Sequence, residues 1–547
     1  MFEFLYFIIS LILIYTSILG YGLIFRGQNK EYDIFLTFIS GYFFVGLITI
    51  FLHFFFPIGD FISIAIMAGG LTFVYIKKNQ LKYFFSIRII STILFISIIL
   101  IGFSEHPIDA NMYHHPYISY IKSEKIIFGI ANIEFRFGHI SFLQYVQAAI
   151  LNSFLNIYSI ASPNLIIYSV FIIYISELIL KKNSKKLTFI LSIIISTFVL
   201  VKLARYREFG NDLIPLVAAS YFLIIIIDNI YYKSKNSNLF FFSPIYATFM
   251  LTHKISYIFS SLIFLTVFKK KYLLEINKHK LIIFLFFITT VLWLTKNIIT
   301  TSCFIYPITQ TCLSNTEWYL QGIADPKQAS WLTELWAKDF ITNPDWEKLN
   351  LDNYINSFAW VSNWLNNHFI KILEKISPIL LVFLLIFIFI NFNNKKTSER
   401  NSIKNINFLY YLLGLIFVGL FIWFIKAPLF RYGSFYIISF ISIIFILITF
   451  NSIDKTNQIR LSKLKYIFFI SLIFFLLKNI NRQINSEYTF FPFTKPNIKN
   501  YEITHKDPLL LRPSSNLSVC YYTKNLCSHE TPGDLKISKI YNYYLFK

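Results

Sequence analysis

Acidic and imidazole side chains gather in one segment of the chain, where they could move protons or bind a cation. Glu105 and Asp109 lie there with four of the ten histidines, which are His106, His114, His115 and His139. A carboxylate beside imidazoles can act as a general base or as a ligand of a divalent cation. The spacing matches no zinc signature, and the alternative is a solvated loop whose side chains bind only one another.

Cationic residues form a second cluster, between positions 202 and 212. Lys202, Arg205 and Arg207 stand here with two acids, Glu208 and Asp212. Arginine forks suit phosphate oxygens, so this cluster could bind an anionic ligand. Internal pairing with the two acids is the equally weighted alternative.

Single basic residues at the ends of other apolar runs extend this pattern. They are Lys254, Lys296 and Arg431. Together with Arg205 and Arg207 they could line one basic pocket, which would fit a diphosphate or a phosphodiester lipid head group.

Apolar runs that recur along all 547 residues must position these side chains. The chain is 56% apolar and 14% charged, with a mean hydropathy of +0.58, which excludes a soluble globular protein and a disordered chain. We therefore predict an all-α polytopic membrane protein of about 14 transmembrane helices. The predicted spans are residues 4–25, 33–56, 60–76, 88–104, 164–180, 187–202, 212–230, 239–252, 255–268, 281–297, 371–392, 407–425, 433–451 and 465–480.

Lysine-rich loops between the runs predict the orientation in the membrane. They account for the net charge of +22, so we expect no nucleic-acid partner. The same loops should be cytoplasmic, which places the long segments 105–163, 298–370 and 481–547 on the outer face. The first run has no cleavage site and is interpreted as an uncleaved span. A short helix over 141–155 should lie along the membrane surface. We expect a multi-pass domain over 1–480 and an outer tail over 481–547.

Cysteines and tryptophans concentrate on the predicted outer face. Cys303 and Cys312 flank one short loop, and Cys520 and Cys527 flank another. Two short-loop disulfides are therefore expected, with four free thiols as the alternative. Six of the eight tryptophans lie in 298–370, where they could stack on sugars or form an interfacial belt. These six are Trp318, Trp331, Trp336, Trp346, Trp360 and Trp364.

The layout resembles the GT-C class of integral-membrane glycosyltransferases, which has many spans, an acid early in a large first outer loop and basic residues in later outer loops. The run Asp109 to Pro116, followed by Gly129–Asn132 and Arg136–Gly138, is similar to that of a family of uncharacterised bacterial multi-pass membrane proteins. That family has a YH-P…GLAN…R-x-G first loop. Lys254–Ser256 and Lys296–Trp318 are similar to its later loops, so the similarity covers about residues 100–320.

The resemblance implies an enzyme that moves a hexosyl or pentosyl group from a polyprenyl-phosphate-linked donor to a glycan or lipid acceptor of the cell envelope. Its active site would face the periplasm from the bacterial inner membrane. Asp109 would be the base or the metal contact, with Glu105 as second choice. No paired acid stands beside Asp109, so a divalent cation is left open as a cofactor. The expected phosphate-binding residues are Arg205, Arg207, Lys254, Lys296, Arg431, His114 and Arg136.

Two alternative functions would use the same residues. A polymerase or ligase of lipid-linked glycans shares the basic pocket and the outer loops. A transporter or flippase of lipid-linked or small polar substrates predicts charges near the bilayer midplane and broken helices in symmetric halves, and neither is visible in the sequence.

Overall fold

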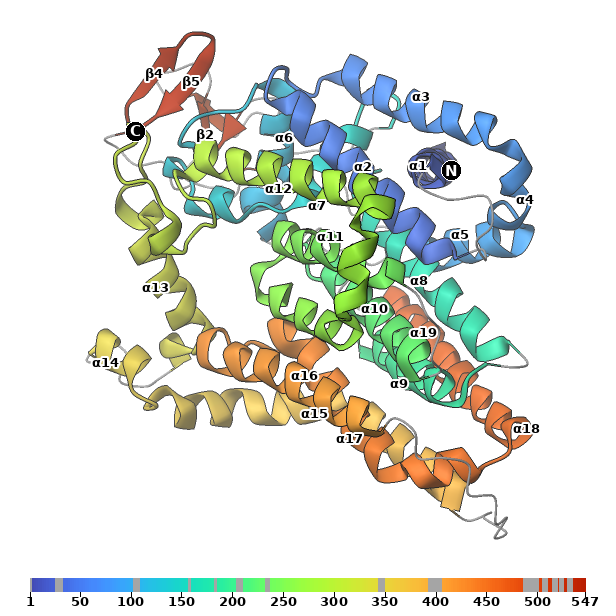
Figure 1. Cartoon of the computed structure of the whole chain (residues 1–547). Helices are drawn as coiled ribbons and strands as arrows, with labels where there is room; N and C mark the ends of the chain where they lie inside the picture. Colours follow the sequence, from blue (N-terminus) through green and yellow to red (C-terminus); the bar gives the residue numbers. More distant parts are fainter. Residues whose placement is uncertain are drawn as a thin grey trace.

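The computed structural model describes most of the chain. The described residues are 2–24, 33–101, 109–155, 159–181, 184–202, 210–231, 237–342, 350–391, 406–485, 501–503, 510–513, 520, 526–528 and 535–547. Most of them are helical (Figure 1), so the predicted all-α fold is confirmed.

Long apolar helices form the body of the molecule. The α-helices are α1 (Phe2–Ile24), α2 (Ile34–His53), α3 (Asp60–Ile76), α4 (Leu81–Phe84), α5 (Ile87–Ile101), α6 (His115–Ser123), α7 (Phe142–Ile150), α8 (Ser162–Leu180), α9 (Lys186–Lys202), α10 (Leu213–Tyr231), α11 (Ser237–His253), α12 (Lys280–Thr301), α13 (Pro326–Ala337), α14 (Leu351–Asn356), α15 (Trp360–Asn391), α16 (Ile406–Lys426), α17 (Phe430–Lys455), α18 (Gln458–Leu461) and α19 (Lys465–Ile484). The tighter or wider turns used below are η2 (Ala110–His114), η3 (Ile130–Asn132), η4 (Phe135–His139), η7 (Ile255–Val267) and η8 (Lys270–His279).

Short strands occur only near the C-terminus among the described residues. They are β1 (Tyr501–Ile503), β2 (Leu510–Pro513), β3 (Leu526–Cys527), β4 (Ile537–Ile540) and β5 (Tyr543–Phe546). The first three form one sheet in the order β1-β2-β3, and β4 pairs with β5 as an antiparallel hairpin.

Each predicted span coincides with a helix, but fewer helices are long enough to cross a bilayer. A crossing needs about 20 apolar residues. Seven described helices meet this requirement, or eight if the bent pair Asp60–Ile76 and Lys78–Phe84 forms one span. The seven are α1, α2, α8, α12, α15, α16 and α17. The predicted ninth span is the 13-residue 3-10 helix η7 rather than an α-helix. The finer number of 14 spans stays a prediction.

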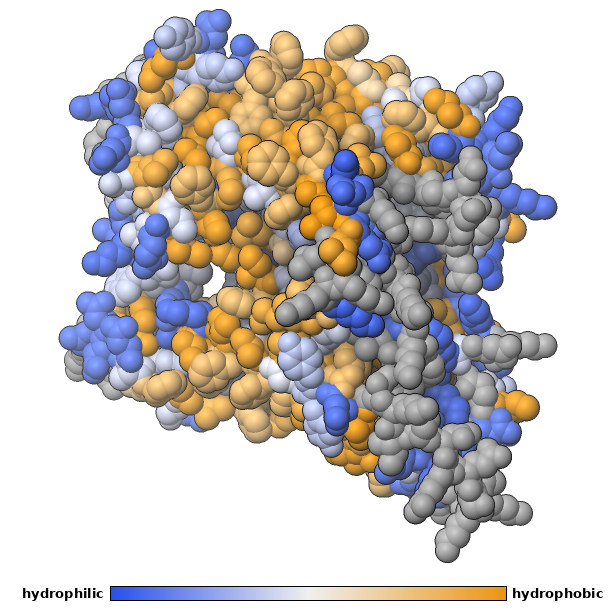
Figure 2. All heavy atoms as spheres, viewed as in Figure 1, coloured by the Kyte–Doolittle hydropathy of each residue, from blue (hydrophilic) through white to orange (hydrophobic). Residues whose placement is uncertain are grey.

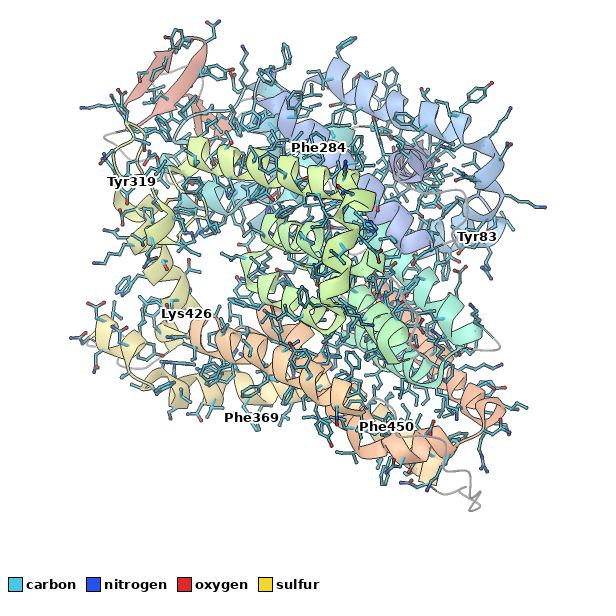
Figure 3. All side chains as sticks on the ribbon, in the orientation of Figure 1. Tyr83, Phe284, Tyr319, Phe369, Lys426 and Phe450 are labelled. Carbon is cyan, nitrogen blue, oxygen red and sulfur yellow. A yellow bond between two sulfur atoms is a disulfide. The ribbon has the colours of Figure 1, made fainter. Side chains whose placement is uncertain are left out.

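The polar and apolar surfaces separate along the molecule. Figure 2 shows hydrophobic side chains in a central belt and hydrophilic ones toward the two sides of the view. In Figure 3, Tyr319 and Lys426 lie at one end, and Tyr83 and Phe450 lie at the other. We call the end with α13, α14, β4 and β5 the loop end, and the end with α4 and α18 the opposite end (Figure 1).

The C-terminal hairpin holds the first long loop in place. Phe128 N–H donates to the carbonyl of Tyr544 at 3.0 Å, and Phe546 N–H donates to the carbonyl of Phe128 at 2.9 Å. Gly129 N–H donates to the carbonyl of Ile299, at the end of α12. Gly129 has φ +67°, and a Cβ there would lie 2.4 Å from the carbonyl oxygen of Phe546, so only glycine fits. The loop that carries Arg136 is therefore anchored on two sides.

The short helix predicted over 141–155 forms, but not on the membrane surface. It is α7, which begins after a capping box between Ser141 and Gln144. Every residue of α7 is buried, and the helix packs against α2, α3 and α6. The surface placement was wrong because the neighbouring helices cover both faces of α7.

Candidate functional site

Three positively charged side chains meet aromatic rings at the loop end. The Lys254 Nζ lies 3.9 Å from the centroid of the Tyr432 ring, and the Arg431 Cζ lies 4.9 Å from the same centroid. Arg431 Nη2 also donates to the Tyr432 hydroxyl at 3.1 Å. Arg136 Cζ lies 5.9 Å from the Tyr113 ring. We call Arg136, Lys254 and Arg431 the cation cluster.

Local structure brings these residues together from distant parts of the chain. Arg431 lies in the first turn of α17, and Lys254 lies between α11 and η7. The hydroxyl of Tyr257 in η7 donates to the backbone carbonyl of Arg431 at 3.3 Å, which ties η7 to the start of α17. Arg136 lies on η4, in the loop anchored by the C-terminal hairpin.

The predicted base Asp109 stands at the edge of the cation cluster. It is exposed at the start of η2, and its charge acts on both Tyr113 and Arg431. Burial raises the pKa of the Tyr113 hydroxyl, and the negative charge of Asp109 raises it further. Tyr113 is therefore a neutral hydrogen-bond donor, placed between an acid and an arginine.

The capping box of α7 fixes the protonation of His114. Gln144 Oε1 accepts from the Ser141 backbone N–H at 3.1 Å, so its Nε2 faces His114 Nδ1 and donates to it at 2.9 Å. Burial, followed by the charges of Lys254 and Arg431, lowers the pKa of His114 to about 3. His114 is thus neutral at physiological pH and carries its proton on Nε2. It can donate a hydrogen bond but cannot serve as a cation for phosphate.

His139 lies near the cations of the loop end. Desolvation by the surrounding protein, followed by the charges of Arg136, Lys254 and Lys296, lowers its pKa to about 4. His139 nevertheless keeps accessible surface. Figure 2 shows an opening through the molecule, and Figure 1 places it between α12 and α16, beside α13.

Charge compensation is incomplete among the cations of the loop end. Arg136 pairs with Glu134 at 3.0 Å, and Lys254 forms an ion pair with Asp212. Asp212 of the 202–212 cluster therefore pairs with a residue outside that cluster. The alternative of internal pairing stays a prediction, because Arg205, Arg207 and Glu208 lie outside the described residues. Within the described ranges, no carboxylate lies within 4 Å of Arg431 or Lys296.

Lys296 is the most deeply buried of the predicted cations. It is 0% exposed near the end of α12, where its Nζ donates to Asn297 Oδ1 at 3.3 Å and lies 4.6 Å from the Trp293 ring. Its charge reaches His139 as well as His53. Lys296 is therefore enclosed by protein rather than placed on an exposed surface.

The structure brings together most of the predicted site residues. Asp109, His114, Arg136, Lys254, Lys296 and Arg431 gather at the loop end. Glu105, Arg205 and Arg207 lie outside the described residues. Sequence reasoning did not assign roles to Tyr113 and Tyr432, which contact the cations directly. The available signal was an aromatic residue immediately beside a basic or imidazole residue, as in Arg431–Tyr432.

The described residues do not form a metal site. No group of three or more His, Cys, Asp or Glu side chains that could hold an ion is found among them. Asp109 thus has no companion ligands in the part of the chain that the structure describes, and we derive no step through a metal.

Disulfides and tryptophans at the loop end shape its framework. Cys303 is bonded to Cys312 and Cys520 to Cys527, which are the two expected pairings. Trp318 Nε1 donates to the carbonyl of Ile298, and Trp364 Nε1 donates to that of Pro428. Trp360 is 1% exposed, whereas Trp336 is 60% exposed. Trp346 lies outside the described residues. These contacts favour a structural role for Trp318, Trp360 and Trp364.

Comparison with known proteins gives a family. The model of a domain of unknown function, DUF8201, matches residues 4–438. No curated protein and no solved structure matches the chain. The match covers α1 to the first third of α17, including every residue of the cation cluster. The chain therefore belongs to the DUF8201 family.

Proposed function

We propose that this protein is a GT-C-like glycosyltransferase that moves a sugar from a polyprenyl-phosphate-linked donor to a glycan or lipid acceptor at the outer face of a membrane. The observation that carries the proposal is the cation cluster, together with Asp109, at one end of a bundle of membrane-length helices. A lipid phosphate must reach its site from the bilayer, and its head group lies at the depth of helix ends.

The residues have complementary roles in such a transfer. Arg431 would bind the donor phosphate, because it lacks a carboxylate partner among the described residues and offers a planar fork of donors. Lys254 would assist, although the phosphate must compete there with Asp212. The Tyr432 ring would hold both cations in position, since they lie on the same ring.

The reaction needs one base and one stabilised leaving group. Asp109 would accept the proton of the acceptor hydroxyl as its oxygen bonds to the sugar carbon. The bond between that carbon and the donor oxygen would break, and the lipid phosphate would leave with the electron pair. The cation cluster would stabilise the negative charge that develops on the leaving oxygen.

Binding of an undecaprenyl-phosphate sugar tests the proposal directly. The full chain in lipid nanodiscs should bind this donor, and Arg431→Gln should weaken binding by about 10- to 100-fold, the effect of losing a charged hydrogen bond. Lys426→Gln is the matched control, because Lys426 lies at the same end but pairs with Glu334 at 3.3 Å. Equal donor affinity of wild type and Arg431→Gln would contradict the proposal.

Product analysis separates the proposal from its alternative. A single sugar on the acceptor supports a glycosyltransferase. Transfer of a whole glycan chain from one lipid to another would indicate a polymerase or ligase acting through the same groups.

A further inference from the structure

An apolar cavity of about 410 Å³ lies in the helix bundle, away from the cation cluster. Helices α1, α2, α10, α11 and α12 line it. Its volume falls in the range of roughly 300–1,000 Å³ that is typical of ligand sites. Aliphatic side chains and aromatic rings share the lining, and the rings include Phe43, Phe222 and Phe249.

Stacked rings close the cavity toward the loop end. Phe43 stacks on Phe142 at 5.3 Å, and the ring of Phe249 lies 4.2 Å from that of His253. Tyr42 and His253 are joined by a hydrogen bond of 3.1 Å. These rings fill the space between the cavity and Lys254, so the cavity is not an extension of the candidate site.

The cavity opens sideways, where α12 faces outward. Leu281 lines the cavity yet is 62% exposed, and Phe284 on the next turn is 57% exposed. Because α12 is long and apolar enough to cross a membrane, this exposed apolar face would contact hydrocarbon in a bilayer. The occupant therefore enters from the bilayer.

Two polar groups mark the end of the cavity at the starts of α2 and α12. They are Asp33 and His279, and the lining contains no lysine or arginine in the described part of the chain. Asp33 Oδ1 accepts from Leu36 N–H at 3.0 Å, and Oδ2 accepts from the Tyr221 hydroxyl at 2.5 Å. A carboxylate has about four acceptor sites, so Asp33 can accept a further donor from a ligand. Burial raises the pKa of the Asp33 carboxyl, whereas hydrogen bonds from Tyr221 and from the backbone of Leu36 and Phe35 lower it. An ammonium beside Asp33 would favour its ionised form, so this group favours an ammonium over a purely anionic head group.

We propose that the cavity binds an acyl chain of an amine-bearing phospholipid, with its ammonium at Asp33. The acyl chain of the lipid fills the space lined by Phe43 and the other rings. The head group stays at the start of α2, beside His279. This site is separate from the proposed transferase site and does not depend on it. It gives the protein a selective lipid contact in the half of the bundle remote from the loop end.

Competition between two lipids tests this proposal. The delipidated full chain is mixed with equal amounts of phosphatidylethanolamine and phosphatidylglycerol, and bound lipid is read by native mass spectrometry. We expect phosphatidylethanolamine to be retained at least about 10-fold over phosphatidylglycerol, and Asp33→Asn to abolish this preference while keeping an acceptor at the helix cap. Equal retention of the two lipids by wild type would overturn the proposal.

Substitutions that fill the cavity provide a second test of lipid binding. Ala218→Phe places a ring in the lined space and should remove the bound lipid, whereas Ala247→Phe, on α11 outside the lining, should not. Ser40→Leu is the milder substitution if Ala218→Phe does not fold, because Ser40 lines the cavity from a partly exposed position. Unchanged lipid retention in the folded filling variant would also overturn the proposal.

Discussion

The two ends of the helix bundle differ in the groups that contact their cations. At the opposite end, Arg88 pairs with Glu177 at 2.8 Å, and Lys185 pairs with Asp228 at 2.8 Å. Tyr83 and Thr188 donate further hydrogen bonds to these two acids. At the loop end, Arg136 and Lys254 are also paired with acids. Arg431 and Lys296 instead contact rings and neutral groups, with no carboxylate within 4 Å among the described residues.

This difference separates charges that hold the fold from charges available to a ligand. A cation with a carboxylate partner is already neutralised, and an anionic ligand must compete with that partner. A cation placed over aromatic rings keeps its capacity for an anion. The groups that contact each cation are therefore a better guide to a binding site than the number of cations.

The largest effect is expected from removing the acid at the loop end. Asp109→Asn should lower kcat/KM for sugar transfer by about 10²- to 10⁴-fold, because the amide cannot accept the acceptor proton. The assay is transfer from a radiolabelled polyprenyl-phosphate sugar, with protein amount measured in parallel. Glu177→Gln, a carboxylate change at the opposite end, is the matched control and should keep its activity. Full activity of Asp109→Asn would exclude this residue as the base.

Replacing the fork of Arg431 should give a smaller effect. Arg431→Lys keeps the charge but loses the planar pair of donors, so we expect the KM for the donor to rise about 10-fold. Steady-state kinetics over a range of donor concentrations measure this change. A KM equal to that of wild type would mean that charge alone acts at this position and would weaken the contrast between the two ends.

Acid should destabilise the loop end selectively. The pKa of His114 is lowered to about 3, against about 6.5 in an unfolded chain, so the unfolded state binds the extra proton between these values. Stability therefore falls as pH drops below 6.5, by at most about 1.4 kcal/mol per pH unit from this group. Thermal unfolding in detergent at pH 7.5 and 5.5 should show a loss that is smaller in His114→Gln. The same pH dependence in both proteins would remove His114 as its source.

The smallest effect is expected at the opposite end. Arg88→Ala removes an ion pair whose arginine side chain is 67% exposed, so it should lower the free energy of unfolding by less than about 1 kcal/mol. Transfer activity should not change. If Arg88→Ala lowered transfer activity as much as Arg431→Lys does, both ends of the bundle would serve the reaction. The proposed difference between the two ends would then be wrong.

Much of the fold could be predicted from the sequence because membrane helices are encoded by long runs of apolar residues. The runs near α1, α2 and α17 lie within a few residues of the helices observed. The burial of α7 inside the protein could not be predicted. A 9-residue apolar helix has the same sequence pattern whether lipid or protein covers it. For η7, hydropathy does not separate a 3-10 helix from an α-helix.

The candidate site was predictable in its composition but not in its pairings. The sequence predicts that Lys254, Lys296 and Arg431 lie at helix ends, because each of them stands beside an apolar run. That Lys254 binds Asp212 and also lies on the Tyr432 ring does not follow, because these residues are separated by 42 and 178 positions in the chain.

The sequence by itself determined an all-helical, membrane-length bundle, the neighbouring cysteines that pair and the set of charged residues at its ends. These features depend on local composition and spacing, which act within one helix or one short loop. Only the tertiary structure decided which cations share a ring, which are neutralised by acids and where the rings enclose a cavity. Those outcomes depend on which helices become neighbours, and that choice is made by side-chain packing between segments far apart in the chain.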